Sequence, residues 1–199
     1  SGRSWLSEDG AFAGTLVLNP DCAPAQAALY SFVIAVSLRE TLSHWLPSEG
    51  LLHKWPNDVL FSGGKLAGIL LEASGNGASV TKLSIGIGIN LCTPSTPVQD
   101  ALHAPTGLDQ GTGDIPSKES LLAQLHKDFL TKETIFKSQG FAPIRAQWLA
   151  HAAKLGEVIR ARTTQAELHG TFQGIDGDGN LLLLTRDGQI AIPAADVYF

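Results

Sequence analysis

The segment from Lys54 to Asn90 decides the fold; it reads KWPND at 54–58, GGKLAGILLE at 63–72 and IGIGIN at 85–90. Strand-forming apolar residues alternate there with lysines, amides and glycines, and the glycines leave the backbone bare. An apolar frame that carries cations, amides and uncovered backbone is typical of a site for a small anionic ligand. The segment therefore indicates a sheet that supports phosphate or acyl-phosphate chemistry.

Helical and strand periodicity extends on both sides of this segment. Apolar residues recur at helical spacing from Pro24 to Leu46, and Ser117 opens a second helix as a capping residue. The patterns predict helices at 24–46, 117–137 and 141–153, strands at 12–18, 51–55, 59–61, 65–72 and 80–91, and a long loop at 93–117.

The last part of the chain has a different pattern. Short apolar runs at 158–162, 166–175, 181–185 and 190–193 are separated by Asp-Gly turns, so that five short strands in about 45 residues predict a small barrel. We place a boundary near Lys154. The predicted domains are residues 1–153 and residues 154–199.

The composition excludes several classes of protein. Of the 199 residues, 44% are hydrophobic and 17% are charged, which is enough for a real core and argues against a disordered chain. The net charge of -5 argues against broad nucleic-acid binding. Cys22 and Cys92 provide no disulfide framework or zinc pattern. We see no membrane-spanning run or signal peptide, and we expect a cytoplasmic protein.

The strand at 85–90 has two opposite faces. Three isoleucines point one way, and Gly86, Gly88 and Asn90 point the other way. The glycine face has no side chains, so something must lie against it. Close packing by another strand or helix is one interpretation. The other is a flat ligand that lies on the backbone with its polar end at Asn90.

Lys65 also has two interpretations. A lysine at the start of a strand is usually a solvated edge charge, but its ammonium group could also act as a point charge beside a carboxylate or phosphate. Strict alternation places Lys65 and Gly68 on opposite faces. Both can contact one ligand only if Gly68 acts through its backbone or the strand bulges near the turn.

The turn at 56–58 offers further polar groups. Asn57 is a residue type that is favoured in turns, which explains it without any function. The carboxylate of Asp58 could also bind magnesium or a ribose. Trp55 is more often a core residue than a stacking platform, and Glu72 is as suited to orienting a neighbour as to catalysis. The six histidines show no metal-ligand spacing, and the chain has no nucleophile elbow, P-loop or dinucleotide fingerprint.

The combination of KWPND at 54–58, a hairpin, GKLAGILLE at 64–72 and GIGIN at 86–90 closely resembles the catalytic domain of biotin–protein ligases, which attach biotin to acetyl-CoA carboxylase. Residues 2–7 resemble the end of the family's glycine/arginine-rich loop, and residues 170–176 resemble its C-terminal SH3-like barrel. The resemblance implies an α/β fold like that of class II aminoacyl-tRNA synthetases, with an antiparallel-rich mixed sheet.

By this resemblance, the protein makes biotinyl-5′-AMP from biotin and ATP and then passes biotin to one acceptor lysine. Lys65 resembles the lysine that contacts the biotin carboxylate and later the acyl phosphate. The implied catalytic residues are Lys65, Arg3 and Asp58; the implied biotin-binding residues are Lys65, Gly68, Leu70, Gly86 and Gly88; the implied ATP- or adenylate-binding residues are Trp5, Lys54, Asn57, Asp58 and Asn90; the implied Mg²⁺ ligand is Asp58.

The implied partners are biotin, ATP with Mg²⁺, and the biotin carboxyl carrier domain of acetyl-CoA carboxylase; a homodimer is an open expectation, and no membrane or nucleic-acid partner is expected. Two rivals stay open: a lipoate or octanoate protein ligase, and a non-catalytic biotin-binding fragment. By the same resemblance Ser1 falls inside the family's loop. We therefore expect a first strand and helix, and half of the biotin site, to lie before Ser1.

Overall fold

The computed structural model of the chain describes residues 10–94, 104–111 and 113–199. Its helices are α1 (Pro24–Ala28), α2 (Tyr30–Leu42), α3 (Lys118–Gln139) and α4 (Phe141–Leu149), with 3-10 turns η1 (Ser48–Gly50) and η2 (Leu108–Gln110). Its strands are β1 (Ala11–Leu18), β2 (Leu51–Lys54), β3 (Asp58–Phe61), β4 (Gly64–Gly75), β5 (Val80–Asn90), β6 (Val158–Arg162), β7 (Glu167–Ile175), β8 (Leu181–Thr185), β9 (Gly188–Ile192) and β10 (Asp196–Tyr198).

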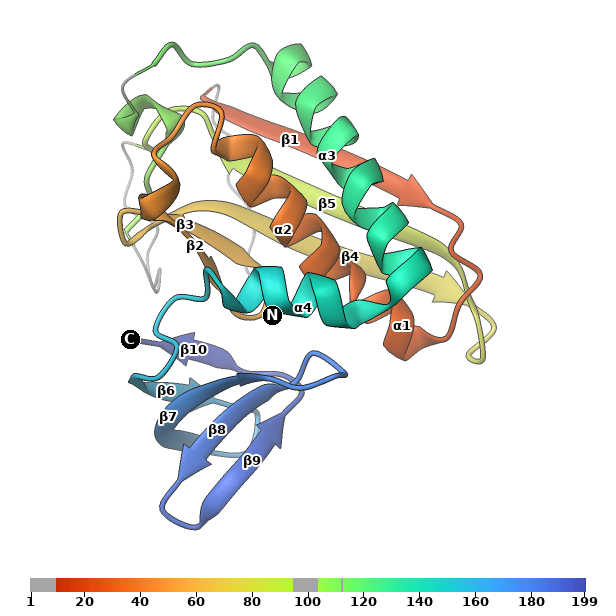
Figure 1. Cartoon of the computed structure of the whole chain (residues 1–199), viewed down its shortest axis with the longest axis vertical. Helices are drawn as coiled ribbons and strands as arrows, with labels where there is room; N and C mark the ends of the chain where they lie inside the picture. The colour runs from red at the N-terminus through yellow and green to blue at the C-terminus, as the bar shows by residue number, and fades with distance from the viewer. Residues whose placement is uncertain (1–9, 95–103, 112) are drawn as a thin grey trace.

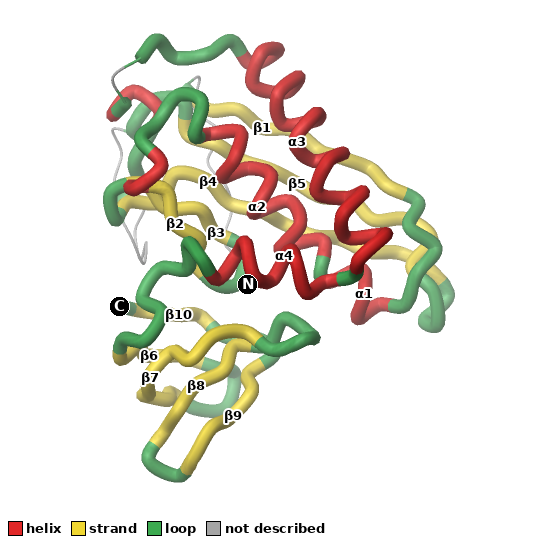
Figure 2. Tube along the Cα trace, viewed as in Figure 1, coloured by secondary structure: helices red, strands yellow, loops and turns green. Residues whose placement is uncertain are grey.

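The strands form two five-stranded sheets, in the order β1-β5-β4-β3-β2 and β10-β6-β7-β8-β9. Helices α2, α3 and α4 lie in front of the first sheet, and the second sheet lies below it (Figures 1 and 2). Every strand pair is antiparallel. The family resemblance implied an antiparallel-rich mixed sheet. In the described chain, parallel pairing occurs only as the isolated bridges His53–Ala152 and Lys65–Pro105.

The predicted strands and helices are confirmed, with two helices shorter than expected. The helix predicted at 24–46 is divided at Leu29, whose N–H donates to the carbonyl of Gln26. It then ends at Leu42 in tight turns with i to i−3 bonds, which are common at helix ends. The third predicted helix ends in the same way at Leu149. Ser117 caps α3 as predicted, because its side chain accepts from the N–H of Ser120 at 3.1 Å.

Helix α2 is the centre of the core. Val33, Ile34, Leu38 and Leu42 are fully buried, and almost no face of the helix is polar until its last turn. A helix that is apolar nearly all round must be covered on every side. The sheet covers α2 behind, and α3 and α4 pack against its sides (Figure 1).

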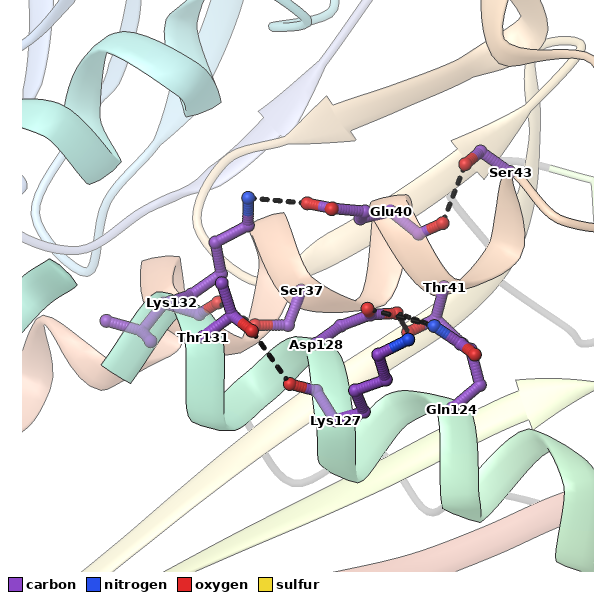
Figure 3. A network of polar contacts seen from close by, with 10 residues as sticks. Ser37, Glu40, Thr41, Ser43, Gln124, Lys127, Asp128, Thr131 and Lys132 are labelled. Atoms are coloured by element: carbon purple, nitrogen blue, oxygen red, sulfur yellow. Dashed lines mark hydrogen bonds and ion pairs between the residues drawn. The ribbon is translucent and has the colours of Figure 1, made fainter. Parts of the chain in front are cut away.

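Polar contacts fix α3 along α2, as the close view in Figure 3 shows. The hydroxyl of Thr41 donates to the carboxylate of Asp128 at 2.7 Å, and Gln124 donates to the same carboxylate at 3.0 Å. One turn further along, Lys132 is paired with Glu40. Asp128 is only 7% exposed, so these bonds supply the partners that a buried carboxylate requires.

The C-terminal sheet docks under the turn that follows β2. The indole N–H of Trp55 donates to the carbonyl of Gly179 at 2.9 Å, and Arg145 of α4 donates to the carbonyl of Ile175 at 2.6 Å. Gly179 has φ +81°, and a Cβ placed there would lie 2.6 Å from the ring of Phe32. The two sheets thus share one hydrophobic core, and a glycine allows the closest approach between them.

We expect Gly179→Ala to destabilise the protein by about 2 kcal/mol, from left-handed backbone strain and overpacking against Phe32. Urea unfolding of both variants measures this. Gly177→Ala is the matched control in the same loop, since a Cβ there meets nothing within 4 Å. Equal stability of the two variants would contradict the close contact between Gly179 and α2.

His53 is a buried histidine on β2. Its ring stacks on Trp148 at a centroid distance of 5.6 Å, and neither ring nitrogen has a hydrogen-bond partner among the described residues. Burial lowers the pKa of His53 to about 3, helped by the positive charge of Arg39 and by His151. The folded state therefore holds His53 neutral.

The pH dependence of stability follows from this lowered pKa. Below the unfolded-state pKa of 6.5, only the unfolded chain gains a proton at His53, so stability falls as the pH falls towards 3. When the pH falls from 7 to 5, protonation of His53 in the unfolded chain should lower the unfolding free energy by about 2 kcal/mol. We expect His53→Leu to remove this part of the pH dependence in urea titrations at the two pH values. An unchanged pH dependence would show that His53 is protonated in the folded state.

Candidate functional site

The bare face of β5 lies on the side of the first sheet away from the helices. Ile85, Ile87 and Ile89 are buried towards α2 and α3, as the alternation predicted. On the opposite side Gly88 is paired with Gly68 of β4, and Gly86 with Leu70. In the part of the chain that the structure describes, no helix lies on this glycine face (Figure 1).

Gly86 shows how open this face is. A Cβ added there would meet only the carbonyl oxygen and Cβ of Leu70, at 3.6 and 3.7 Å, which are ordinary contact distances. Leu70 itself is 61% exposed, although it is a large apolar residue in the middle of a sheet. At Gly86, no described helix or strand packs over the backbone. The packing interpretation therefore fails at this glycine, and an open apolar floor remains.

A bulge in β4 resolves the conflict between Lys65 and Gly68. Val59 of β3 is paired with Ala67, but the next residue of β3, Leu60, is paired with Lys65, so Leu66 is an extra residue. Leu66 and Ala67 are both fully buried as a result. Lys65 is shifted onto the same face as Gly68, as the sequence required if both are to contact one ligand.

Lys65 and Asp58 form an ion pair at the edge of the glycine face. The ammonium Nζ lies 2.7 Å from Oδ1 of Asp58, and the two side chains are 36% and 15% exposed. Asp58 is paired directly with Gly68 in the sheet. The structure thus brings a cation, a carboxylate and the bare backbone together. This arrangement can hold an anionic group at one end of a flat apolar ligand.

Two predicted amides are engaged with the main chain. The side-chain amide of Asn57 donates to the carbonyl of Ile69 at 2.6 Å, so it holds the turn against β4. The side-chain amide of Asn90 donates to the carbonyls of Lys65 and Thr106 at 3.2 and 2.9 Å. Contacts of either residue with a nucleotide stay predictions.

The remaining predicted residues lie at the border of the site or outside the described residues. Lys54 is 3% exposed, and its Nζ lies 5.7 Å from the ring centroid of Phe199. Trp55 is 4% exposed, which confirms it as a core residue. Arg3 and Trp5 belong to the segment 1–9, which lies outside the described residues.

The described residues contain no cluster of three or more histidine, cysteine, aspartate or glutamate side chains that could hold a metal ion. Asp58 is a single carboxylate, and Mg²⁺ is often held by one carboxylate together with phosphate oxygens of a substrate.

An apolar cavity of about 60 Å³ lies on the helix side of the first sheet, between β1 and α3. It is lined by Gly14, Ile87 and Phe129, and it is too small for a ligand of ordinary size.

Sequence reasoning missed the residues that hold Lys65 from outside the sheet. Ala104 and Thr106 bond to the main chain of Lys65, although they come from the segment predicted as a loop. It also missed Phe199, the last residue, which lies over Lys54. No local pattern marks these three residues, because each acts through a contact that is remote in sequence.

Comparison with known proteins first defines the class. Residues 1–90 match the model of the Biotin/lipoate A/B protein ligase family, and residues 154–199 match that of the Biotin protein ligase C terminal domain. A Biotin--[acetyl-CoA-carboxylase] ligase of Paracoccus denitrificans is 45% identical over 100% of this chain and 84% of its own length. The chain belongs to the biotin–protein ligase family.

More distant relatives and solved structures agree with this assignment. The Bifunctional ligase/repressor BirA of Bacillus subtilis is 30% identical over 98% of this chain, which spans only 60% of that relative. The structure of the biotin protein ligase from Aquifex aeolicus in complex with biotin and ATP superimposes with a TM-score of 0.80 at 27% identity. The match covers 98% of this chain and 81% of that one. Among the described residues, no helix is long and apolar enough to cross a membrane.

Proposed function

We propose that this protein is an ATP-dependent biotin–protein ligase that forms biotinyl-5′-AMP and transfers biotin to a lysine of a biotin carboxyl carrier domain. One observation carries the proposal: the β4 bulge places Lys65 beside Asp58 at the edge of the glycine face, which is open at Gly86. The names of the Paracoccus relative and of the Aquifex complex support the same reaction and substrates.

Biotin lies on the glycine face in this proposal. Gly86 and Gly88 form a floor without side chains, Gly68 contributes backbone, and the exposed Leu70 forms an apolar wall. A bicyclic ring with an aliphatic chain can lie flat on such a surface and bury apolar area. The carboxylate of biotin then reaches the edge of this face, where Lys65 lies.

Lys65 acts by charge. In the first step a carboxylate oxygen of biotin attacks the α-phosphorus of ATP, an acyl–phosphate bond forms, and pyrophosphate leaves. Two anions must approach each other, and a fixed ammonium group between them lowers the electrostatic cost of the transition state. In the second step the acceptor amine attacks the acyl carbon, AMP leaves, and an amide forms. No residue of the protein is acylated.

The nucleotide lies at the Asp58 end of the site. Asp58 would hold Mg²⁺ together with phosphate oxygens, and the ion would neutralise charge on the phosphates. Lys54 and Asn57 support this turn. By the resemblance to the family, Arg3 belongs to the loop that closes over the adenylate, and Trp5 contacts the adenine. Asn90 belongs to the same end.

We place the division between ligase domain and C-terminal domain at residues 153 and 154. Trp55 and Gly179 join the two, so the C-terminal domain supports the turn that carries Asp58. The acceptor domain, a cytoplasmic location and a homodimer complete the proposal.

The direct test is ATP-dependent transfer of labelled biotin to a purified biotin carboxyl carrier domain by the full-length protein. Lipoate and octanoate are offered in parallel. Transfer of biotin alone supports the proposal. Transfer of lipoate or octanoate instead would identify the rival ligase, and biotin binding without transfer would identify a binding protein.

Lys65→Ala should lower the rate of biotinyl-adenylate formation by about 100-fold to 1,000-fold, as removal of a single charge-stabilising group does in other active sites. Biotin-dependent release of pyrophosphate measures this step. Lys82→Ala, which removes an exposed lysine at the far end of β5, is the matched control. Adenylate formation at the wild-type rate in Lys65→Ala would remove the basis of the mechanism.

Gly86→Val should weaken biotin binding about tenfold or more, because the new side chain occupies the floor on which the ligand lies. The fold should tolerate it, since the nearest described atoms lie at 3.6 Å and valine suits a strand. Calorimetry gives the affinity and thermal unfolding gives the stability. Gly177→Val, in an exposed turn, is the control. Unchanged biotin affinity would show that the ligand lies elsewhere.

A further inference from the structure

The main chain of Lys65 is held by a segment 40 residues away. Its N–H donates to the carbonyl of Ala104 at 2.9 Å, and its carbonyl accepts from the N–H of Thr106 at 3.0 Å. The side-chain amide of Asn90 donates to this same carbonyl at 3.2 Å and to the carbonyl of Thr106 at 2.9 Å. One amide group therefore ties the end of β5 to Lys65 and to the segment 104–106.

This contact is buried and closely packed. Asn90 is 7% exposed and Thr106 is 8% exposed, so little water competes for the bonds. A Cβ added to Gly64 would lie 2.9 Å from Cβ of Thr106 and 3.1 Å from the carbonyl oxygen of Ala104. The segment 104–106 thus rests directly on the glycine before Lys65, where a larger residue would push it away.

The position of Lys65 depends on the bulge at Leu66. Side chains alternate along a strand, so a shift of one residue moves every side chain beyond it to the other face. If β4 ran without the extra residue, Lys65 would face the helices and Leu66 would face the ligand. The bonds from Asn90 and from the segment 104–106 hold the main chain of Lys65, the residue that faces opposite sides of the sheet in the two registers.

We propose that Asn90 is a positioning residue: with the segment 104–106 it locks the bulged register of β4 and so keeps the Lys65 ammonium on the glycine face. Asn90 acts on the position of Lys65 through the main chain of that residue. The inference rests on the proposed function, because the ligand that reports the position of Lys65 is biotin.

The test uses Asn90→Asp in the full-length protein and measures the biotin dissociation constant by calorimetry without nucleotide. Aspartate has the shape of asparagine but has no donor for the two carbonyls and repels them. We expect biotin to bind about tenfold more weakly, because the displaced Lys65 ammonium loses its hydrogen bond to the biotin carboxylate, and a bond between charged groups contributes about that much. In a Lys65→Ala background, where the ammonium is already gone, the same change should have no further effect.

Gly64→Ala provides a second route, since it displaces the segment 104–106 without touching Asn90; the same loss of biotin affinity is expected. Asn76→Asp and Gly113→Ala are matched controls: Asn76 lies in an exposed turn where only its oxygen is used, and a Cβ on Gly113 meets nothing within 4 Å. Both controls should bind biotin as the unaltered protein does.

Two results would overturn the register lock. One is wild-type biotin affinity in Asn90→Asp and Gly64→Ala with a raised KM for ATP in Asn90→Asp, which would make Asn90 a nucleotide ligand. The other is an equal loss of biotin affinity with and without Lys65. If the unaltered protein itself binds no biotin, the proposed function fails instead, so the two failures are distinguishable.

Discussion

The bulge of β4 at Leu66 is the constraint on which the candidate site depends. A regular strand would place Lys65 and Gly68 on opposite faces of the sheet, and no single ligand could contact both side-chain positions. The extra residue buries Leu66 and Ala67 together and turns Lys65 towards Asp58, with Nζ and Oδ1 2.7 Å apart. The ion pair and the ligand end that we propose both follow from this one irregularity.

The two faces of the first sheet differ in what covers them. On one face, three isoleucines of β5 and the apolar helix α2 belong to the hydrophobic core, and their burial stabilises the fold. On the other face Gly86 of β5 leaves the backbone open near the centre of the sheet, beside the exposed Leu70. The helices therefore pack on one side of the first sheet, which leaves the other side available for a ligand.

The C-terminal sheet belongs to the same core and is more than an appended module. Trp55 immediately precedes the turn that leads to Asp58, and its indole N–H is bonded to Gly179 of the C-terminal sheet. Phe199 lies over Lys54 at the end of β2. Contacts from the C-terminal domain thus reach the two residues that precede the turn, Lys54 and Trp55, which gives this domain a physical route to the position of Asp58.

By itself the sequence determined the order of strands and helices, the buried and bare faces of β5, and the cap at Ser117, because these depend on side-chain periodicity and on contacts within a few residues. It also named Lys65, Asp58, Gly68 and Gly86 as neighbours in one site. Only the tertiary structure decided how Lys65 reaches that site and what Asn90 binds. A bulge and a bond to Thr106 depend on pairing between distant strands and loops, and such pairing leaves no local pattern in the sequence.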